Sequence, residues 1–325
     1  MAEFYYPKET KYISVTDPIG EAYTATKQIL FKPFDLGKWF LLGFCAFLAD
    51  LGSGGPYGNG GGNSSTRGFR SFNAAQEYFI DWFNKYWEWI LSAAWLLAVG
   101  FLLISVLLLW LSSRGKFMLL DGVVRNRGAV VEAWRKFKEQ ANSLFLWRFI
   151  LFIVGMTTIV LIVAVSLKIA WPDIRAERFD SNAITALVLG VPTFIIAIIF
   201  LTVLGQILND FVAPIMYKRG ILGGEAIGIF RREILDNRGG TFILFYLMKF
   251  LLGFAAGILV FLAIPLTCCI ACVFLIIPYI NSVFLLPITV FFRTYSLYFL
   301  QQFGPEWELL GRPEMIGIEP ENNPE

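Results

Sequence analysis

The sequence contains no histidine among its 325 residues. This absence removes the commonest general base, the usual zinc ligand and any Ser-His-Asp arrangement. Carboxylates, lysines and cysteines remain as possible catalytic groups, and none of them clusters into a recognisable constellation along the chain. We therefore expect a protein that is not an enzyme and that needs no cofactor.

Cysteine is also scarce, with four residues: Cys45, Cys268, Cys269 and Cys272. The segment CCIAC contains a Cys-x-x-Cys spacing, which is found in redox motifs and metal sites, but one such pair supplies too few ligands for a closed zinc site. We interpret the cysteines as small apolar residues at helix contacts and expect no metal site.

Charged residues make up only 16% of the chain, against about 25% in a typical soluble domain, whereas 57% of the residues are hydrophobic. This composition predicts an all-α integral membrane protein. The net charge of +2, without any Lys/Arg-rich run, gives no reason to expect a nucleic-acid partner. The polar N-terminus lacks the apolar core of a cleavable signal peptide, so we expect the first membrane span to serve as the signal.

Long uncharged runs predict about six transmembrane helices. The first, residues 34–52, is marginal, because its uncharged core is short against the roughly 20 residues that a bilayer requires. The region 242–302 is long enough for two long helices or three short ones. The predicted spans are 34–52, 90–111, 149–170, 183–208 and two within 242–302.

Basic residues gather after the second and fourth predicted spans, in 112–148 and 218–238. The positive-inside rule places these segments in the cytoplasm, and six spans then leave both termini there. The aromatic segment 81–89 is typical of the opposite membrane surface, and the glycine-rich segment 52–68 of a flexible outer loop. We expect a protein of the bacterial cytoplasmic membrane.

A short amphipathic pattern occurs three times, each time before an apolar run. Glu21, Glu132 and Glu225 are each followed by apolar or small residues at positions +1, +2, +5 and +9, with Thr26 as the exception. This is the spacing of one helical face. The pattern predicts basic helices that lie in the membrane interface with the apolar side toward the acyl chains.

Each predicted unit also closes with an apolar stretch that ends in glycine: LLDGVVRNRG, FVAPIMYKRG and YSLYFLQQFG. We therefore predict three repeats of an interfacial amphipathic helix plus a transmembrane hairpin. The predicted organisation is a cytoplasmic tail (1–18), one membrane domain (19–304) with repeats at about 19–128, 129–220 and 221–304, and a polar C-terminal tail (305–325).

The basic faces of the second and third amphipathic helices are the first candidate site. Cations on such faces attract anionic lipid headgroups. We predict membrane lipids as partners, and a protein partner is the alternative. The candidate headgroup contacts are Arg135, Lys136, Lys138, Arg231 and Arg232.

Ionisable residues within apolar runs form a second candidate site. Burial of a charge at membrane depth is costly and requires a partner or a water-filled cavity. Lys249 and Arg293 fall at similar depth near the cytoplasmic side, level with Asn209 and Asp210, and we expect an Arg293–Asp210 ion pair. Snorkelling of the two cations to the headgroups is the structural alternative. With Pro192, Pro214, Pro265, Pro278 and Pro287, which break helix hydrogen bonds, these residues also support a transporter or channel hypothesis.

Three segments show a family resemblance: FKPFDLGKWFLLGF, FVAPIMYKRG and LLPITVFFRTYSLYFLQQFGPE. They resemble uncharacterised bacterial polytopic proteins similar to the membrane domain attached to some glycerophosphodiester phosphodiesterases. The resemblance implies a cytoplasmic-membrane protein with several helices. The soluble phosphodiesterase domain needs histidines and is therefore absent from this chain.

Overall fold

The computed structural model describes residues 13–32, 34–51, 72–128, 130–176, 178, 180–236, 239–266 and 277–311, and for 72–94, 264 and 278 only the backbone. Every regular element in these ranges is helical. The elements are α1 (Asp17–Phe31), α2 (Leu36–Asp50), α3 (Phe72–Val124), α4 (Val130–Lys136), α5 (Lys138–Arg175), α6 (Ser181–Ile207), the π-helix η1 (Leu208–Val212), α7 (Ala213–Arg219), α8 (Gly223–Ile229), the π-helix η2 (Phe230–Leu235), α9 (Gly239–Leu266), α11 (Pro278–Phe284), α12 (Leu286–Gln301) and the short 3₁₀ helix η3 (Pro305–Trp307).

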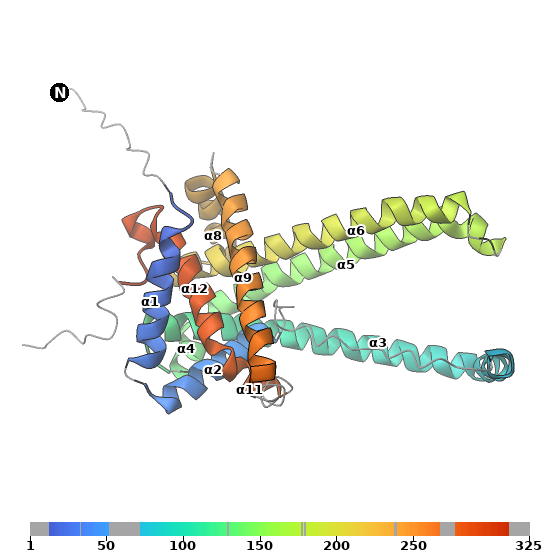
Figure 1. Ribbon diagram of the computed structural model, residues 1–325, viewed down its shortest axis with the longest axis horizontal. Helices are drawn as coiled ribbons and strands as arrows, with labels where there is room; N and C mark the ends of the chain where they lie inside the picture. Colours follow the sequence, from blue (N-terminus) through green and yellow to red (C-terminus); the bar gives the residue numbers. More distant parts are fainter. Residues whose placement is uncertain are drawn as a thin grey trace, which may run out of the picture.

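The helices form a packed body from which long helices project (Figure 1). α5 and α6 run side by side as a hairpin, and α3 leaves the body in the same direction. The turn of the hairpin is fixed by Asp173, whose carboxylate accepts hydrogen bonds from the Asn182 side chain and the Ala183 backbone N–H, both at 2.8 Å. The projecting helices are therefore anchored at the body and tied together at the far end of the hairpin.

Within the described residues, four stretches are long and apolar enough to cross a bilayer: Trp95–Val124, Lys138–Arg175, Ser181–Arg219 and Gly239–Ala263. They contain the predicted spans 149–170 and 183–208, residues 95–111 of the predicted span 90–111, and the first part of 242–302. The protein therefore has the helices of a membrane protein. The predicted count of about six spans is not shown.

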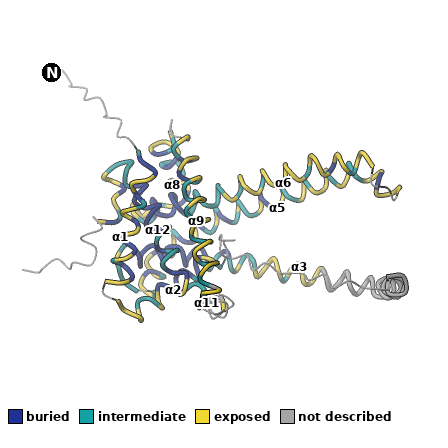
Figure 2. The backbone as a smooth tube through the Cα atoms, viewed as in Figure 1, coloured by how far each residue is buried: buried dark blue, intermediate teal, exposed yellow. Residues whose placement is uncertain are grey.

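Many residues of the projecting helices are exposed (yellow in Figure 2), and most of the large ones are apolar. Leu96 on α3, Leu161 on α5 and Ile196 on α6 are 77%, 64% and 67% exposed. Water solvates such surfaces poorly, whereas hydrocarbon covers them without cost. These are the faces that acyl chains would cover.

Two predicted spans differ from the expectation. The segment 34–52 forms α2, whose 15 residues give a length of roughly 22 Å, shorter than the roughly 30 Å hydrocarbon core. The final span is divided between α11 and α12, and residues from Tyr295 to Leu300 of α12 are fully or almost fully buried. Protein rather than lipid covers these apolar residues. The region 242–302 contains α9, α11 and α12, with 267–276 outside the described residues.

The three amphipathic segments are helical, but their apolar faces do not point toward acyl chains. The alanines at the +1 position, Ala22, Ala133 and Ala226, are at most 2% exposed. The +5 and +9 positions are also buried in all three segments. Their apolar sides pack into the hydrophobic core of the body, so the expectation of an acyl-chain contact for these faces was wrong.

Each amphipathic segment packs against a helix that leads into a closing stretch: the second and third segments against the preceding unit, and the first segment against the last unit. α4 and the start of α5 contact α3, α8 contacts α7 and η1, and α1 contacts α12. The closing stretches themselves contribute Leu120, Ile215 and Phe299 to the core, all fully buried. The core of the body is therefore the place where the three predicted closing stretches meet.

The described parts of both predicted tails, 1–18 and 305–325, belong to the packed body. Ser14 exchanges two backbone hydrogen bonds with the Gln302 side chain, at 2.7 and 2.8 Å. After α12, Trp307 and Leu310 are only 1% and 2% exposed. The packed part thus extends beyond 19–304 in both directions, because the residues just outside it cover α12.

The glycine-rich segment 52–68 and the three cysteines of CCIAC lie outside the described residues, as do the side chains of the aromatic segment 81–89. The fourth cysteine, Cys45, is buried in α2.

Gly115 lies at a close contact between α2 and α3. A Cβ atom at this position would lie 2.6 Å from Leu48 Cβ and as close to the α2 backbone. We expect Gly115→Ala to lower the free energy of unfolding by roughly 1–3 kcal/mol, because the α2 backbone would have to move. Thermal unfolding in detergent would measure the loss.

Gly100→Ala is the matched control on the same helix, since nothing lies within 4 Å of its added Cβ. We expect it to leave stability unchanged or slightly raised, because alanine favours the helix. Equal unfolding temperatures for the two variants would contradict the tight α2–α3 contact.

Candidate functional site

The first site is a surface pocket of ≈ 370 Å³ between α3 and the α4–α5 junction, here named the Trp–Arg pocket. It is lined by Trp110, Arg114, Trp134, Arg135 and Lys138. Two of the predicted headgroup contacts, Arg135 and Lys138, therefore line the same pocket. The predicted contact Lys136 instead lies over the Phe137 ring, 5.3 Å from its centroid.

Arg114 is the inner wall of this pocket. Its guanidinium carbon lies 4.8 Å from the Trp110 ring centroid and 4.7 Å from that of Trp134, within cation–π range of both. It donates hydrogen bonds to the Trp134 carbonyl and the Asn142 side chain. Arg114 is only 6% exposed, and its buried Nε has no hydrogen-bond partner among the described residues. The pocket thus has a fixed, mostly buried cation beneath two exposed ones.

The Trp–Arg pocket lies where α3 enters the body. From Trp95 to Leu107 the apolar side chains of α3 are largely exposed, and burial begins at Leu109. Tryptophan is enriched at this kind of boundary, the level of the lipid headgroups. Trp110 and Arg114 were not predicted as site residues. Their spacing of four residues at the end of an uncharged run was the available signal.

A second pocket of ≈ 370 Å³ is formed at η2, here named the η2 pocket. Its lining residues are Arg231, Arg232, Leu235 and Asp236. Both predicted cations of the third amphipathic segment line it, but the carboxylate of Asp236 offsets part of their charge. Among the described lining residues, the Trp–Arg pocket holds three cations without a carboxylate, and it is the stronger candidate for an anion.

The predicted buried-charge residues come together at the base of the projecting helices. Lys249 Nζ lies 2.5 Å from Asp210 Oδ2, and Arg293 Nη1 donates to the Asn209 carbonyl oxygen at 2.6 Å. The expected Arg293–Asp210 ion pair was wrong, because Lys249 occupies the carboxylate. Snorkelling is also wrong for Arg293, which is only 9% exposed.

Two further cations belong to this region and were not predicted as site residues. Lys116 of α3 lies within electrostatic range of Arg148, Arg293 and Asp210, and also of Asp50. Arg148 of α5 donates to the hydroxyls of Ser112 and Ser113 at 3.1 and 3.0 Å. We name Lys116, Arg148, Asp210, Lys249 and Arg293 the central charge cluster.

The local backbone places Asp210 in this cluster. Asp210 lies in the π-helix η1, and Pro214 follows four residues later. Proline has no N–H to donate to the carbonyl oxygen four residues before it, so the regular α-helical bond is lost at this point. A π-turn is one way in which a helix adjusts to such a break, and π-turns are frequent at functional sites.

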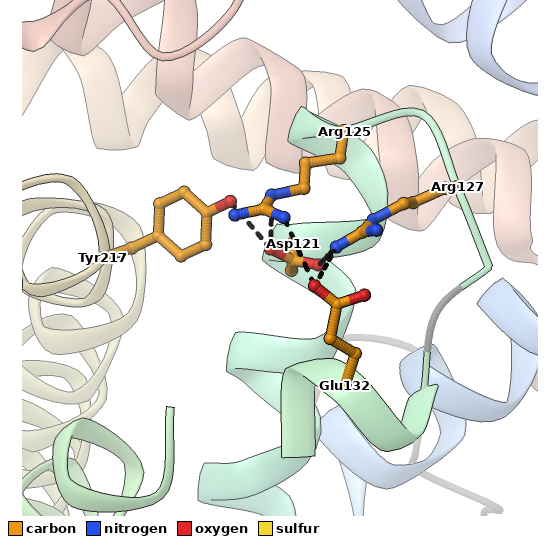
Figure 3. Close-up of polar contacts among 5 residues, drawn as sticks. All are labelled: Asp121, Arg125, Arg127, Glu132 and Tyr217. Atoms are coloured by element: carbon orange, nitrogen blue, oxygen red, sulfur yellow. Dashed lines mark hydrogen bonds and ion pairs between the residues drawn. The ribbon is translucent and has the colours of Figure 1, made fainter. Parts of the chain in front are cut away.

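A third group of charges surrounds Asp121 at the α3–α4 turn (Figure 3). Its carboxylate lies 3.1 Å from Arg125 Nε and 3.7 Å from Arg127 Nη2, and it accepts a hydrogen bond from the Tyr217 hydroxyl at 2.9 Å. Arg127 also donates a hydrogen bond to the Glu132 carboxylate, and this bond holds the pKa of Glu132 below its usual range. Since Asp121 is only 1% exposed and satisfied, we interpret this group as structural.

Metal ligands do not gather in the described part of the chain, where no group of three or more Cys, Asp or Glu side chains could hold an ion.

Asp121→Asn would test the structural interpretation. The substitution removes the negative charge from a buried position that faces two arginines, so we expect the free energy of unfolding to fall by roughly 1–3 kcal/mol. Thermal unfolding in detergent gives the measurement. Glu139→Gln, an exposed change of the same kind on α5, is the control, and an equal effect of both would contradict the interpretation.

No curated protein and no solved structure matches the chain. One family model matches it, and its description gives neither an activity nor a link to glycerophosphodiester phosphodiesterases, so that resemblance stays a prediction. The match covers residues 13–282, which include both pockets and all of the central charge cluster except Arg293. The chain belongs to the family of unknown function DUF7544.

Proposed function

We propose that this protein is a non-enzymatic, multi-pass protein of the bacterial cytoplasmic membrane that binds anionic lipid headgroups through the basic residues of the Trp–Arg pocket. The observation that supports the proposal is the Trp–Arg pocket. It combines three cations and two tryptophan rings at the boundary between the exposed apolar part of α3 and the packed body.

The chemistry of this pocket fits a phosphate-bearing headgroup. Arg114 presents an unpartnered N–H from a nearly buried position, and guanidinium groups bind phosphate oxygens with strong, charge-assisted hydrogen bonds. Arg135 and Lys138 lie at the open side of the pocket, where their charges attract an anionic surface. The acyl chains of such a lipid would then lie along the exposed apolar face of α3.

We further propose the three-repeat organisation with both termini in the cytoplasm. The cyclic packing of amphipathic segments on closing stretches supports it, since the first segment meets the last closing stretch and completes a ring. The pairing of Ser14 with Gln302 brings the two described ends of the chain to the same side of the body. The orientation itself follows from the basic segments near the body.

A variant that neutralises Arg135 and Lys138 by glutamine tests the lipid-binding proposal. At about 1 kcal/mol for each basic residue near an anionic surface, we expect its affinity for anionic lipid to fall by about 30-fold. Native mass spectrometry of the gently extracted protein would measure this as lost bound lipid.

Lys168→Gln with Arg175→Gln is the matched control. It removes the same charge from the far part of α5, where Arg175 stacks on Trp171 with 5.3 Å to the ring centroid. We expect the control to keep the lipid that the first variant loses. Equal retention of anionic lipid by both variants would remove the Trp–Arg pocket from the proposal.

A transporter or channel is the second candidate, because buried charges, a π-helix and Pro214 coincide at the base of the spans. Solute flux into liposomes containing the protein is the measurement, with Arg293→Ala as the variant. We expect any flux through this region to fall by about tenfold or more when the buried guanidinium is removed. Flux that Arg293→Ala leaves unchanged would rule out a pathway at the central charge cluster.

A further inference from the structure

The central charge cluster contains one charged residue from each of the three helical segments that lead into the closing stretches. Lys116, Asp210 and Arg293 each stand ten to twelve residues before the glycine that closes their unit. In the folded chain the three lie within electrostatic range of one another. The cluster is therefore central to the body and does not belong to one helix pair.

Arg293 leaves two donors unused at this place. Its Nη1 donates to the Asn209 carbonyl oxygen, whereas its buried Nε and Nη2 have no hydrogen-bond partner among the described residues. These two N–H groups lie along one edge of the guanidinium and point in parallel. That edge matches two oxygens of a phosphate or carboxylate, and buried donors of this kind are costly to leave unpaired.

The formal charges of the cluster do not balance. Without Arg148, three cations (Lys116, Lys249 and Arg293) face Asp210 and the nearby Asp50, which leaves one positive charge in excess among these described residues. Lys249 and Asp210 already neutralise each other at 2.5 Å. The excess therefore falls on Lys116 and Arg293, which share the nearby Asp50, beside the unused edge of the guanidinium.

We propose that the central charge cluster binds a phosphate group, with two of its oxygens on the Nε and Nη2 donors of Arg293 and its charge balanced by Lys116. Phosphate fits because it supplies parallel acceptor oxygens together with a charge close to the excess. The group belongs either to a membrane lipid or to a free phosphate. This site is separate from the Trp–Arg pocket and does not rest on it.

The first experiment uses the purified full-length protein in an uncharged detergent. Inorganic phosphate is titrated against thermal unfolding, with chloride at equal ionic strength as the reference. For a free-phosphate site we expect phosphate to raise the unfolding temperature above the chloride value. In Arg293→Lys, which keeps the charge but loses the parallel donors, we expect the apparent affinity for phosphate to fall by about tenfold or more.

The second experiment is native mass spectrometry of the same proteins after gentle extraction. If the phosphate belongs to a lipid, the wild type retains a phospholipid that Arg293→Lys loses. The Arg135→Gln, Lys138→Gln variant separates the two sites, because it removes two cations of the Trp–Arg pocket. We expect it to lose the lipid of that pocket but to keep the wild-type response to phosphate in thermal unfolding, whereas Arg293→Lys should keep the lipid of that pocket. The two proposals can thus fail separately.

Three results would overturn the site. One is a phosphate response equal to that of chloride together with unchanged phospholipid retention in Arg293→Lys, which would mean that water satisfies the donors. Another is a phosphate response that Arg293→Lys leaves intact. If that variant does not fold, Lys116→Gln replaces it from α3, and an unchanged affinity there would be the third.

Discussion

The aromatic contacts of Phe211 hold the body together at the point where the long helices meet. Its fully buried ring lies 5.5 Å from Phe230, 5.2 Å from Phe242, 5.3 Å from Phe245 and 6.0 Å from Phe299 between centroids. Through these rings η1, η2, α9 and α12 share one core. Because aromatic pairs combine large apolar area with preferred geometry, the cluster also fixes how these helices are rotated relative to one another.

That rotation decides where the buried charges lie. Asp210 is the neighbour of Phe211 in η1, Lys249 follows Phe245 by one helical turn on α9, and both therefore have their directions set by the aromatic core. A lone carboxylate in this place would lose its hydration without compensation. The Lys249 ammonium provides that compensation, which is why Arg293 is left to find another acceptor.

The sequence pattern was sufficient to predict the projecting helices, because the uncharged runs of α3, α5 and α6 are long enough to cross a bilayer. It failed for α2 and α12, since hydropathy shows that a segment avoids water but not whether lipid or protein covers it. Tyr295 and Phe299 are apolar enough for a span, yet other helices bury them completely. The same ambiguity led to the wrong environment for Ala22, Ala133 and Ala226.

For the central charge cluster, the pattern indicated which residues lie near one another better than which of them pair. The structure brings Lys249, Asp210 and Arg293 together, but the partner of Asp210 depended on helix rotation, to which the π-helix at 208–212 contributes. Arg148 and Lys116 seemed to be ordinary cytoplasmic cations because they follow or precede apolar runs by only a few residues. Burial by neighbouring units is a property of the assembled body, and no local spacing shows it.

The two proposed anion sites share one physical constraint. If the apolar projecting helices span the bilayer, they join the packed body at the level of the lipid headgroups, where cations are favoured on the cytoplasmic side. Cations at the outer edge of that junction, such as Arg135 and Lys138, are exposed, and in the proposed function they would contact lipid headgroups. Cations a turn or two further inward, such as Lys116 and Arg293, are enclosed by the closing helices. Their charges then require a partner from within the protein or a bound anion, and the described residues supply only part of that partner.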